Sequence, residues 1–207
     1  MQINLLAVKN DTKRRFEDIY IALDALAGKT KIDYQLILKS SLMLMVYNAV
    51  EGTVNNLVVE LFDAICQNKL QISQLPNKLQ KTIFMYHLKK IGQDPCKLRD
   101  CCNDSSEDLC FVSYLEINKY LKLFSGNLDS RSIRVASSKI GINLPNGIDE
   151  PVLLEVKNFR NKLAHGESTF RNTCQDITAQ NMEEIVKKTE AYLTALIAAY
   201  ENDLSRF

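Results

Sequence analysis

Val156-Lys157-Asn158-Phe159-Arg160-Asn161-Lys162-Leu163-Ala164-His165-Gly166 is the segment from which the organisation of this chain can be worked out. Asp149-Glu150-Pro151 precedes it and predicts a helix start, because acidic groups favour the positive end of the helix dipole and proline fits the first turn. Gly166 predicts the matching end, since glycine enters a left-handed conformation without steric cost. The apolar residues between these signals recur at helical spacing and predict one buried face: Val152, Val156, Phe159 and Leu163.

The polar residues of this helix are predicted to lie away from its buried face. Asn161 and His165 are four residues apart and therefore share one side of the helix. Arg160 lies about 140° round the axis from His165, but its side chain is long enough to reach the same place. A fixed cation beside a group that exchanges protons near neutral pH suits phosphate chemistry. The alternative is a surface arginine and a histidine that only complements the negative end of the dipole.

The pattern Arg160-Asn161-x-x-x-His165 resembles the R-polar-x-x-x-H motif of the HEPN superfamily, and Leu163-Ala164-His165-Gly166-Glu167 is typical of its bacterial members. Two further stretches are similar to the MAE-type HEPN-like nucleases, which are bacterial proteins of about this length. They are Leu44-Met45-Val46-Tyr47-Asn48-Ala49-Val50-Glu51-Gly52-Thr53 and Ser125-Gly126-Asn127-Leu128-Asp129-Ser130-Arg131-Ser132-Ile133-Arg134. The resemblance implies an all-α, HEPN-like up-and-down helical bundle, with extra helices inserted before the motif helix.

The length and composition fit one domain over residues 1–207. The resemblance implies that this domain is HEPN-like and helical, with a less regular insertion at 92–145. Only 7 glycines and 4 prolines occur in 207 residues, which favours long helices over tight turns. The net charge of +1 gives no global attraction to nucleic acid, so RNA binding would need local basic patches. The N-terminus shows no signal peptide, and we expect a cytoplasmic protein in which the six cysteines are reduced.

Helical periodicity and end signals place the other elements. The loop from Glu167 to Gln175 is expected to be polar, and strand remains open as an alternative at Phe111–Tyr114. The helices are expected at about Thr12–Ala27, from an N-cap at Asp33 to Cys66 or Asn68, from Leu75-Pro76 to Ile91, within Phe111–Phe124, from an N-cap at Asp129 over Ser130–Ile140, and at about Thr178–Leu204.

The second of these helices is apolar over Leu42–Val50, but polar residues keep the apolar run too short for a membrane span. Asn48, Glu51 and Asn55 form a polar stripe along it. In the resembling family, a polar or acidic residue on the equivalent early helix often faces the R…H motif, so Glu51 is a site candidate. The alternative is that Glu51 pairs with an arginine or with backbone amides, because an unpaired buried charge is expensive.

Other chemistry-bearing residues carry weaker signals. The cysteines at 96, 101, 102 and 110 lack paired C-x-x-C spacing, so free thiols in an irregular loop are favoured over a zinc site. His87 lies among core-like residues and is expected to be packed or hydrogen-bonded. The sequence leaves open whether Arg131 and Arg134, or the lysines of the helix ending at Ile91, contact RNA.

The chain has no Gly-rich phosphate loop, no H-E-x-x-H motif, no nucleophile elbow and no clustered carboxylates for a two-metal site. The resemblance implies a metal-independent endoribonuclease, a toxin of a toxin–antitoxin or phage-defence system, that acts as a homodimer on RNA and needs no cofactor. Arg160 would clamp the phosphate, His165 would transfer protons, Asn161 would orient one of them, and Glu51 is the fourth candidate. An antitoxin protein would be a further partner, and no membrane is expected. The alternative is a non-catalytic HEPN module that dimerises and binds a nucleotide or a partner protein.

Overall fold

The structure is a computed structural model that describes residues 5–28, 31–92, 112–124, 126–145 and 150–204. Within these ranges every regular element is a helix, and no strand occurs. The elements are α1 (Leu6–Ala27), α2 (Ile32–Gln67), the 3-10 turn η1 (Ile72–Gln74), α3 (Asn77–Ile91), α5 (Tyr114–Leu121), α6 (Ser130–Lys139), α7 (Glu150–Ala164), α8 (Phe170–Thr173) and α9 (Ala179–Leu204).

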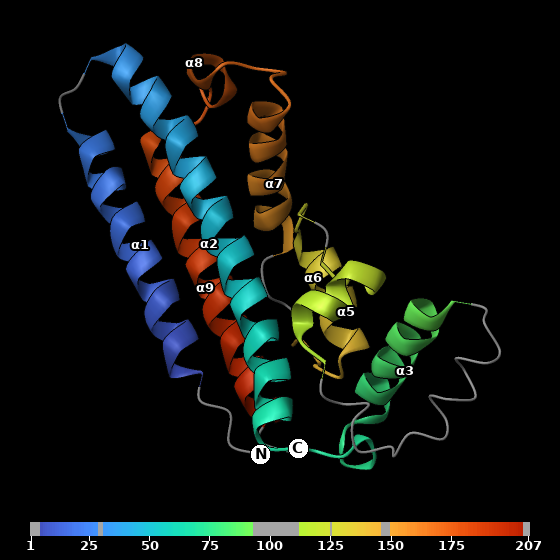
Figure 1. The fold of residues 1–207 in the computed structure, drawn as a ribbon. Coiled ribbons are helices and arrows are strands. Elements are labelled where there is room, and N and C mark those ends of the chain that lie inside the picture. Colours follow the sequence, from blue (N-terminus) through green and yellow to red (C-terminus); the bar gives the residue numbers. More distant parts are fainter. Residues whose placement is uncertain (1–4, 29–30, 93–111, 125, 146–149, 205–207) are drawn as a thin grey trace.

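Three long helices, α1, α2 and α9, run side by side and form the body of the bundle (Figure 1). The shorter α7 packs on α2 and α9, and α8 packs on α2 and α7. Helices α3, α5 and α6 form a second group, which meets the bundle where α5 packs on α2 and α6 packs on α7. This arrangement confirms the expected all-α fold with additional helices before the motif helix, which is α7.

Helix α2 is the centre of the core because neighbours cover it on several sides. Its 36 residues extend over about 54 Å at 1.5 Å per residue. Side chains with almost no exposure lie along the helix from Ser40 to Ile65, among them Leu42, Val46, Leu57, Leu61 and Phe62. By length and composition α2 could cross a membrane, but 56% of its most apolar window is buried inside the bundle. Packing within the protein therefore accounts for its apolar sequence.

The contact between α1 and α2 is close because Gly52 has no side chain. A Cβ atom at Gly52 would lie 2.8 Å from Cζ of Arg15, so the guanidinium occupies the space that a larger residue would need. Arg15 Nε donates to Asp11 Oδ2 at 2.8 Å, and Asn56 Nδ2 donates to the same oxygen at 3.1 Å. Asp11 therefore links the two helices through Asn56, and Arg15 packs against α2 at Gly52.

The first helix begins at Leu6, earlier than the sequence predicts. Thr12 was the expected first residue, but its hydroxyl lies 2.9 Å from the hydroxyl of Thr53 and links α1 to α2. The preceding turn of α1 is stabilised by burial of Leu5 and Val8, each 2% exposed. Tertiary packing therefore extends the helix past the polar residues that suggest a start.

Three further expectations about local structure differ from what is observed. Helix α2 begins at Ile32 with Lys31 as N-cap, so the predicted N-cap Asp33 lies inside the first turn. The loop predicted to be polar and irregular contains the short helix α8. Between Val112 and Tyr114 there is no strand; instead the Ser113 hydroxyl caps α5 by accepting a hydrogen bond from the Glu116 N–H at 3.4 Å.

Candidate functional site

The motif lies in the last turns of α7, which are fixed by burial and by the helix end. Val152, Leu153 and Val156 are at most 4% exposed and hold the helix against the bundle. At the C-terminus, Glu167 N–H donates to Lys162 O at 2.9 Å and Gly166 N–H donates to Leu163 O at 3.2 Å. Gly166 has a φ of +68°, so this is a Schellman termination with glycine in the left-handed position. His165 is consequently the residue between the last helical turn and this glycine.

The guanidinium of Arg160 is held on two sides. Its Cζ lies 4.8 Å from the centroid of the Tyr47 ring, a distance at which the cation is attracted to the ring face. Its Nη1 donates to Asn161 Oδ1 at 3.1 Å. An arginine carries five N–H donors, so these contacts fix the group while leaving most donors without a partner among the described residues.

Tyr47 is a rigid support for Arg160 because both ends of its side chain are fixed. Only 1% of the residue is exposed. Its hydroxyl donates to Gly126 O at 3.0 Å and accepts from Leu128 N–H at 3.0 Å. Burial raises the pKa of Tyr47, and this outweighs the lowering effects of the Leu128 hydrogen bond and of Arg160. The hydroxyl therefore stays protonated and keeps donating to the loop between α5 and α6.

The same loop is tied to α7 by two polar contacts. Asn161 Nδ2 donates to Asn127 Oδ1 at 2.9 Å. Lys157 Nζ lies 2.5 Å from Asp129 Oδ2, and the two side chains are only 16% and 19% exposed. Burial alone would raise the pKa of Asp129, but the hydrogen bonds from Lys157 and from Ser132 outweigh it and hold that pKa below its ordinary value. The start of α6 is thus fixed against the motif turn of α7.

Asp129 also confirms a local prediction, since it is the N-cap of α6. Its carboxylate accepts from Ser132 N–H at 2.8 Å, while the Ser132 hydroxyl accepts from Asp129 N–H at 2.8 Å. This reciprocal pair satisfies two backbone donors that a helix start otherwise leaves open. One carboxylate therefore serves both the helix cap and the ion pair to α7.

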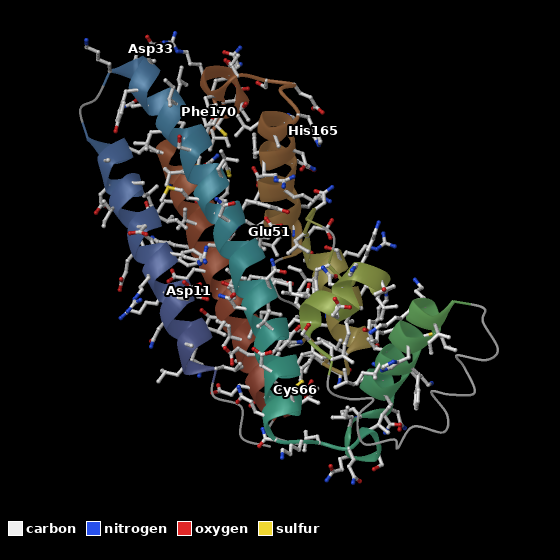
Figure 2. The ribbon with its side chains drawn as sticks, viewed as in Figure 1. Asp11, Asp33, Glu51, Cys66, His165 and Phe170 are labelled. Carbon is white, nitrogen blue, oxygen red and sulfur yellow. The ribbon has the colours of Figure 1, made fainter. Side chains whose placement is uncertain are left out.

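His165 stands one turn beyond Asn161, at the end of α7 (Figure 2). Its backbone N–H donates to Asn161 O at 2.9 Å, while its side chain is exposed. The imidazole has no hydrogen-bond partner among the described residues, and no contact joins it to Arg160 within that part of the chain. The structure thus leaves the imidazole open to solvent.

Glu51 lies on α2 one turn after Tyr47 and is half-buried (Figure 2). Its Oε1 is 3.3 Å from where a Cβ on Gly126 would lie, so the carboxylate borders the loop that receives the Tyr47 hydroxyl. Neither an arginine nor a backbone amide of the described residues bonds to it. The alternative, in which Glu51 pairs with an arginine or with backbone amides, is therefore not found among the described residues. The carboxylate lies beside the loop that also contacts Asn161.

The structure brings Arg160 and Asn161 into direct contact, places Glu51 beside the adjoining loop, and leaves His165 one turn away. Two residues that the sequence pattern does not single out complete this arrangement, Tyr47 and Asn127. Both lie within the stretches that carry the family resemblance, 44–53 and 125–134. Membership in these two stretches is the sequence feature that could have indicated them, because the two stretches and the motif on α7 contact one another in the fold.

The remaining candidates from the sequence include two arginines, the second histidine and the cysteines. Arg134 Nη1 donates to Leu144 O at 3.0 Å, which holds the segment after α6, while Arg131 is exposed. His87 packs edge-on against the ring of Tyr86 at 4.9 Å, as expected for a packed histidine. Cys66 and Cys174 are free thiols, and burial raises the pKa of both. The prediction for the cysteines at 96, 101, 102 and 110 lies outside the described residues.

A model of the family described as HEPN_MAE_28990:/-like HEPN matches residues 6–207, nearly the whole chain. The chain belongs to this HEPN family. The match confirms the resemblance drawn from the three stretches, and the helical bundle agrees with it. No curated protein and no solved structure gives a significant match to this HEPN chain. HEPN domains are generally associated with ribonuclease activity, and the contacts around Arg160 give that association a physical location to test.

Proposed function

We propose that this HEPN protein is a metal-independent endoribonuclease, the toxin of a toxin–antitoxin or phage-defence system, acting in the cytoplasm as a homodimer. The observation that carries the proposal is the seating of Arg160 on the ring of Tyr47, at 4.8 Å, with Asn161 bonded to its Nη1. A cation that is already fixed needs no reorganisation when charge develops on a phosphate. The open donors of Arg160 and the open imidazole of His165, one turn apart on one helix, suit a phosphodiester of RNA.

In the proposed reaction, the 2′-oxygen of a ribose bonds to the adjacent phosphorus and the bond from phosphorus to the 5′-oxygen breaks. The 2′-hydroxyl loses its proton to a base, and the departing 5′-oxygen receives a proton from an acid. Arg160 stabilises the charge on the phosphate, Asn161 orients Arg160, and His165 carries out one proton transfer. Glu51, beside the loop at Gly126, is the fourth candidate, as a group that orients the site.

The homodimer follows from the number of proton transfers. Each chain carries one motif histidine, whereas the reaction needs both a base and an acid. The partner subunit's His165 supplies the second group if two motif turns face one another across a twofold axis. Sedimentation should therefore give a dimer at micromolar concentration, and a stable monomer that still cuts RNA would exclude the composite site.

The catalytic assignment is tested by His165→Ala and Arg160→Ala, with Lys162→Ala as the matched control. Lys162 is an exposed cation on the same turn, where it lies over the Phe159 ring at 5.7 Å. The first two changes should each lower kcat by about a hundred- to ten-thousandfold, because each removes proton transfer or a preorganised charge. Lys162→Ala should leave kcat within a factor of a few of the parent, about the effect of a surface charge.

The products distinguish this mechanism from others. The 5′ fragment should end in a 2′,3′-cyclic phosphate, and cleavage should persist in a chelator. A plain 3′-hydroxyl end, or activity lost with the chelator, would contradict 2′-OH attack even if RNA is cut. A parent protein that binds RNA or a nucleotide and cuts nothing would favour the non-catalytic HEPN module instead.

A further inference from the structure

A second concave feature shares no residue with the Arg160 site. It is a pocket of about 370 Å³ between α3, the end of α5 and the end of α6. Figure 1 shows these three helices grouped beside the bundle. Its volume lies within the range of about 300–1,000 Å³ typical of small-molecule sites. The pocket is lined by Lys78, Lys81, Thr82, Met85, Lys89, Leu121, Leu123 and Lys139.

The lining divides into an apolar floor and a basic rim. Leu121, Leu123 and Met85 supply the apolar surface. The four lysines come from α3 and from the last residue of α6, so the tertiary fold gathers charges that are up to 61 residues apart in sequence (Lys78 to Lys139). Thr82 Oγ1 donates to Lys139 O at 2.7 Å and fixes α3 against α6. The two helices that carry the lysines are therefore held in a fixed relative position.

The positive charge of the rim is not neutralised by the described residues. Lys78 Nζ donates to the neutral Ser138 hydroxyl at 3.0 Å, and Lys89 Nζ donates to Tyr120 O at 3.5 Å. None of the four rim lysines forms an ion pair within the described ranges. The whole chain has a net charge of only +1, so this rim is a local concentration of charge that attracts an anion.

The lining also restricts the class of anion. A small hydrated anion such as inorganic phosphate would use the lysines and leave the apolar floor exposed. A nucleotide unit uses both, because its base has a flat apolar face and its phosphates carry the negative charge. Apolar contact below and lysine contact above is therefore the chemistry of a nucleotide.

Helix α6 connects this pocket to the Arg160 site. At its start, Asp129 pairs with Lys157 of α7, and at its end Lys139 lines the pocket. The helix has 10 residues, which at 1.5 Å per residue separates its two ends by about 14 Å. At about 3.4 Å per stacked nucleotide, one strand covers that distance in about four nucleotides.

We propose that the pocket between α3, α5 and α6 binds a nucleotide of the RNA substrate, on the same strand as the phosphate held at Arg160 and several nucleotides from it. This inference rests on the proposed ribonuclease function and assigns that function a second contact. It makes the enzyme depend on substrate length, since an RNA of two nucleotides cannot reach both places. The lysine rim fixes the position of the strand without contacting the reacting phosphate.

Binding of a fluorescent single-stranded RNA octanucleotide to the cleavage-impaired His165→Ala protein tests the pocket. The double change Lys81→Gln with Lys139→Gln is compared with Lys13→Gln and Lys187→Gln, two exposed lysines on α1 and α9. Each pair lowers the net charge by two, from +1 to −1. Removing two phosphate contacts should lower the slope of log K against log salt concentration by about 1.4, at about 0.7 per contact for a single strand. The control pair should leave the slope unchanged.

Three results would overturn the pocket proposal. The first is an equal change in the salt-dependence slope for the pocket pair (Lys81→Gln with Lys139→Gln) and the control pair (Lys13→Gln with Lys187→Gln). The second is a slope for the octanucleotide that the pocket pair leaves unaltered. The third is binding of free AMP to the pocket as tightly as the octanucleotide binds. In the otherwise unaltered enzyme, the pocket pair should raise KM for the octanucleotide and leave cleavage of a dinucleotide unchanged. If the pocket pair changes the salt-dependence slope but the parent protein does not cleave RNA, the ribonuclease function is rejected and binding of RNA in the pocket is retained. If the parent cleaves RNA but the pocket pair leaves the slope unchanged, the pocket proposal is rejected and the ribonuclease function is retained.

Discussion

The Schellman termination of α7 allows the position of His165 to be changed by a substitution at the neighbouring Gly166, with His165 itself left in place. Gly166 has a φ of +68°, and a Cβ there would meet nothing within 4 Å, so Gly166→Ala adds a backbone cost and no steric clash. A non-glycine residue in this region costs about 1–2 kcal/mol. Alanine also reduces the conformational entropy of the unfolded chain, which stabilises the folded protein by about 0.4–1 kcal/mol. The net loss in the free energy of unfolding is then about 1 kcal/mol. For a domain of this size, that loss lowers Tm by about 2–4 °C.

The effect on catalysis should be much larger than the effect on stability. The alanine can avoid strain by opening the last turn, which gives up the hydrogen bonds from Gly166 and Glu167, each about 0.5–1.5 kcal/mol. Keeping alanine in the left-handed conformation and opening the last turn of α7 therefore cost similar free energies. The turn that holds His165 will then be open in a substantial fraction of the molecules. A displacement of about 1 Å at a catalytic group can cost about a hundredfold in rate. We therefore expect kcat at saturating RNA to fall by about ten- to a hundredfold, measured beside Tm by thermal unfolding.

Gly92→Ala is the matched control, because Gly92 ends α3 with a φ of +71° and also has nothing within 4 Å of an added Cβ. With a ψ of −154°, Gly92 has a conformation that essentially only glycine adopts, so the Tm of Gly92→Ala should fall at least as far. Its kcat should stay at the parent value, since α3 contributes no residue to the Arg160 site. Full activity in Gly166→Ala, or equal loss of activity in both variants, would refute the idea that the helix end positions His165.

Two further expectations concern tyrosines. Tyr47→Phe leaves the buried Leu128 N–H without its acceptor at a cost of about 1–3 kcal/mol, but keeps the ring under Arg160. It should therefore lower the free energy of unfolding measured in urea more than it lowers kcat, whereas Tyr47→Leu should lower both. Equal losses of kcat in the two variants would show that the ring does not hold Arg160. Burial raises the pKa of Tyr114 to about 12, and burial together with the hydrogen bond to Glu190 raises that of Tyr20 to about 12. Because these values lie above the unfolded value of about 10, the stability they contribute is complete below pH 10 and is lost as the pH rises towards 12. Tyrosinate absorbance at about pH 11 should therefore show fewer of the eight tyrosines ionised in the native chain than in denaturant, and equal absorbance in a chain that is still helical would contradict this.

The sequence predicts the fold where local rules decide it. Glu150 and Pro151, which begin α7, and Gly166, which follows it, act within one or two turns, and the structure has the helix between these two signals. The same holds for α6, where the cap at Asp129 is contained in four residues. Helix α8 is missed because four residues are too few to establish a period. The start of α1 is missed because the polar group of Thr12 bonds across to Thr53 in another helix.

The candidate site divides in the same way. Arg160 and Asn161 are neighbours on one helix, so the motif places them together before any fold is known. The support for Arg160 comes from Tyr47, which is 113 positions earlier in the chain, and Asn161 reaches Asn127 across 34 positions. Such pairings depend on how the helices pack, and no local spacing specifies them. Tyr47 in isolation is indistinguishable from any other buried aromatic residue of an apolar helix.

The separation of these contacts along the chain has a consequence for protein synthesis. The ribosome makes Tyr47 first, the loop at Gly126 later and Arg160 later still, and α9, which covers α1 and α2, follows all of them. Until α9 has been made and has packed, the apolar surfaces of α1 and α2 that it covers remain exposed. The bundle that supports Arg160 is therefore completed only after every residue of the site has been made.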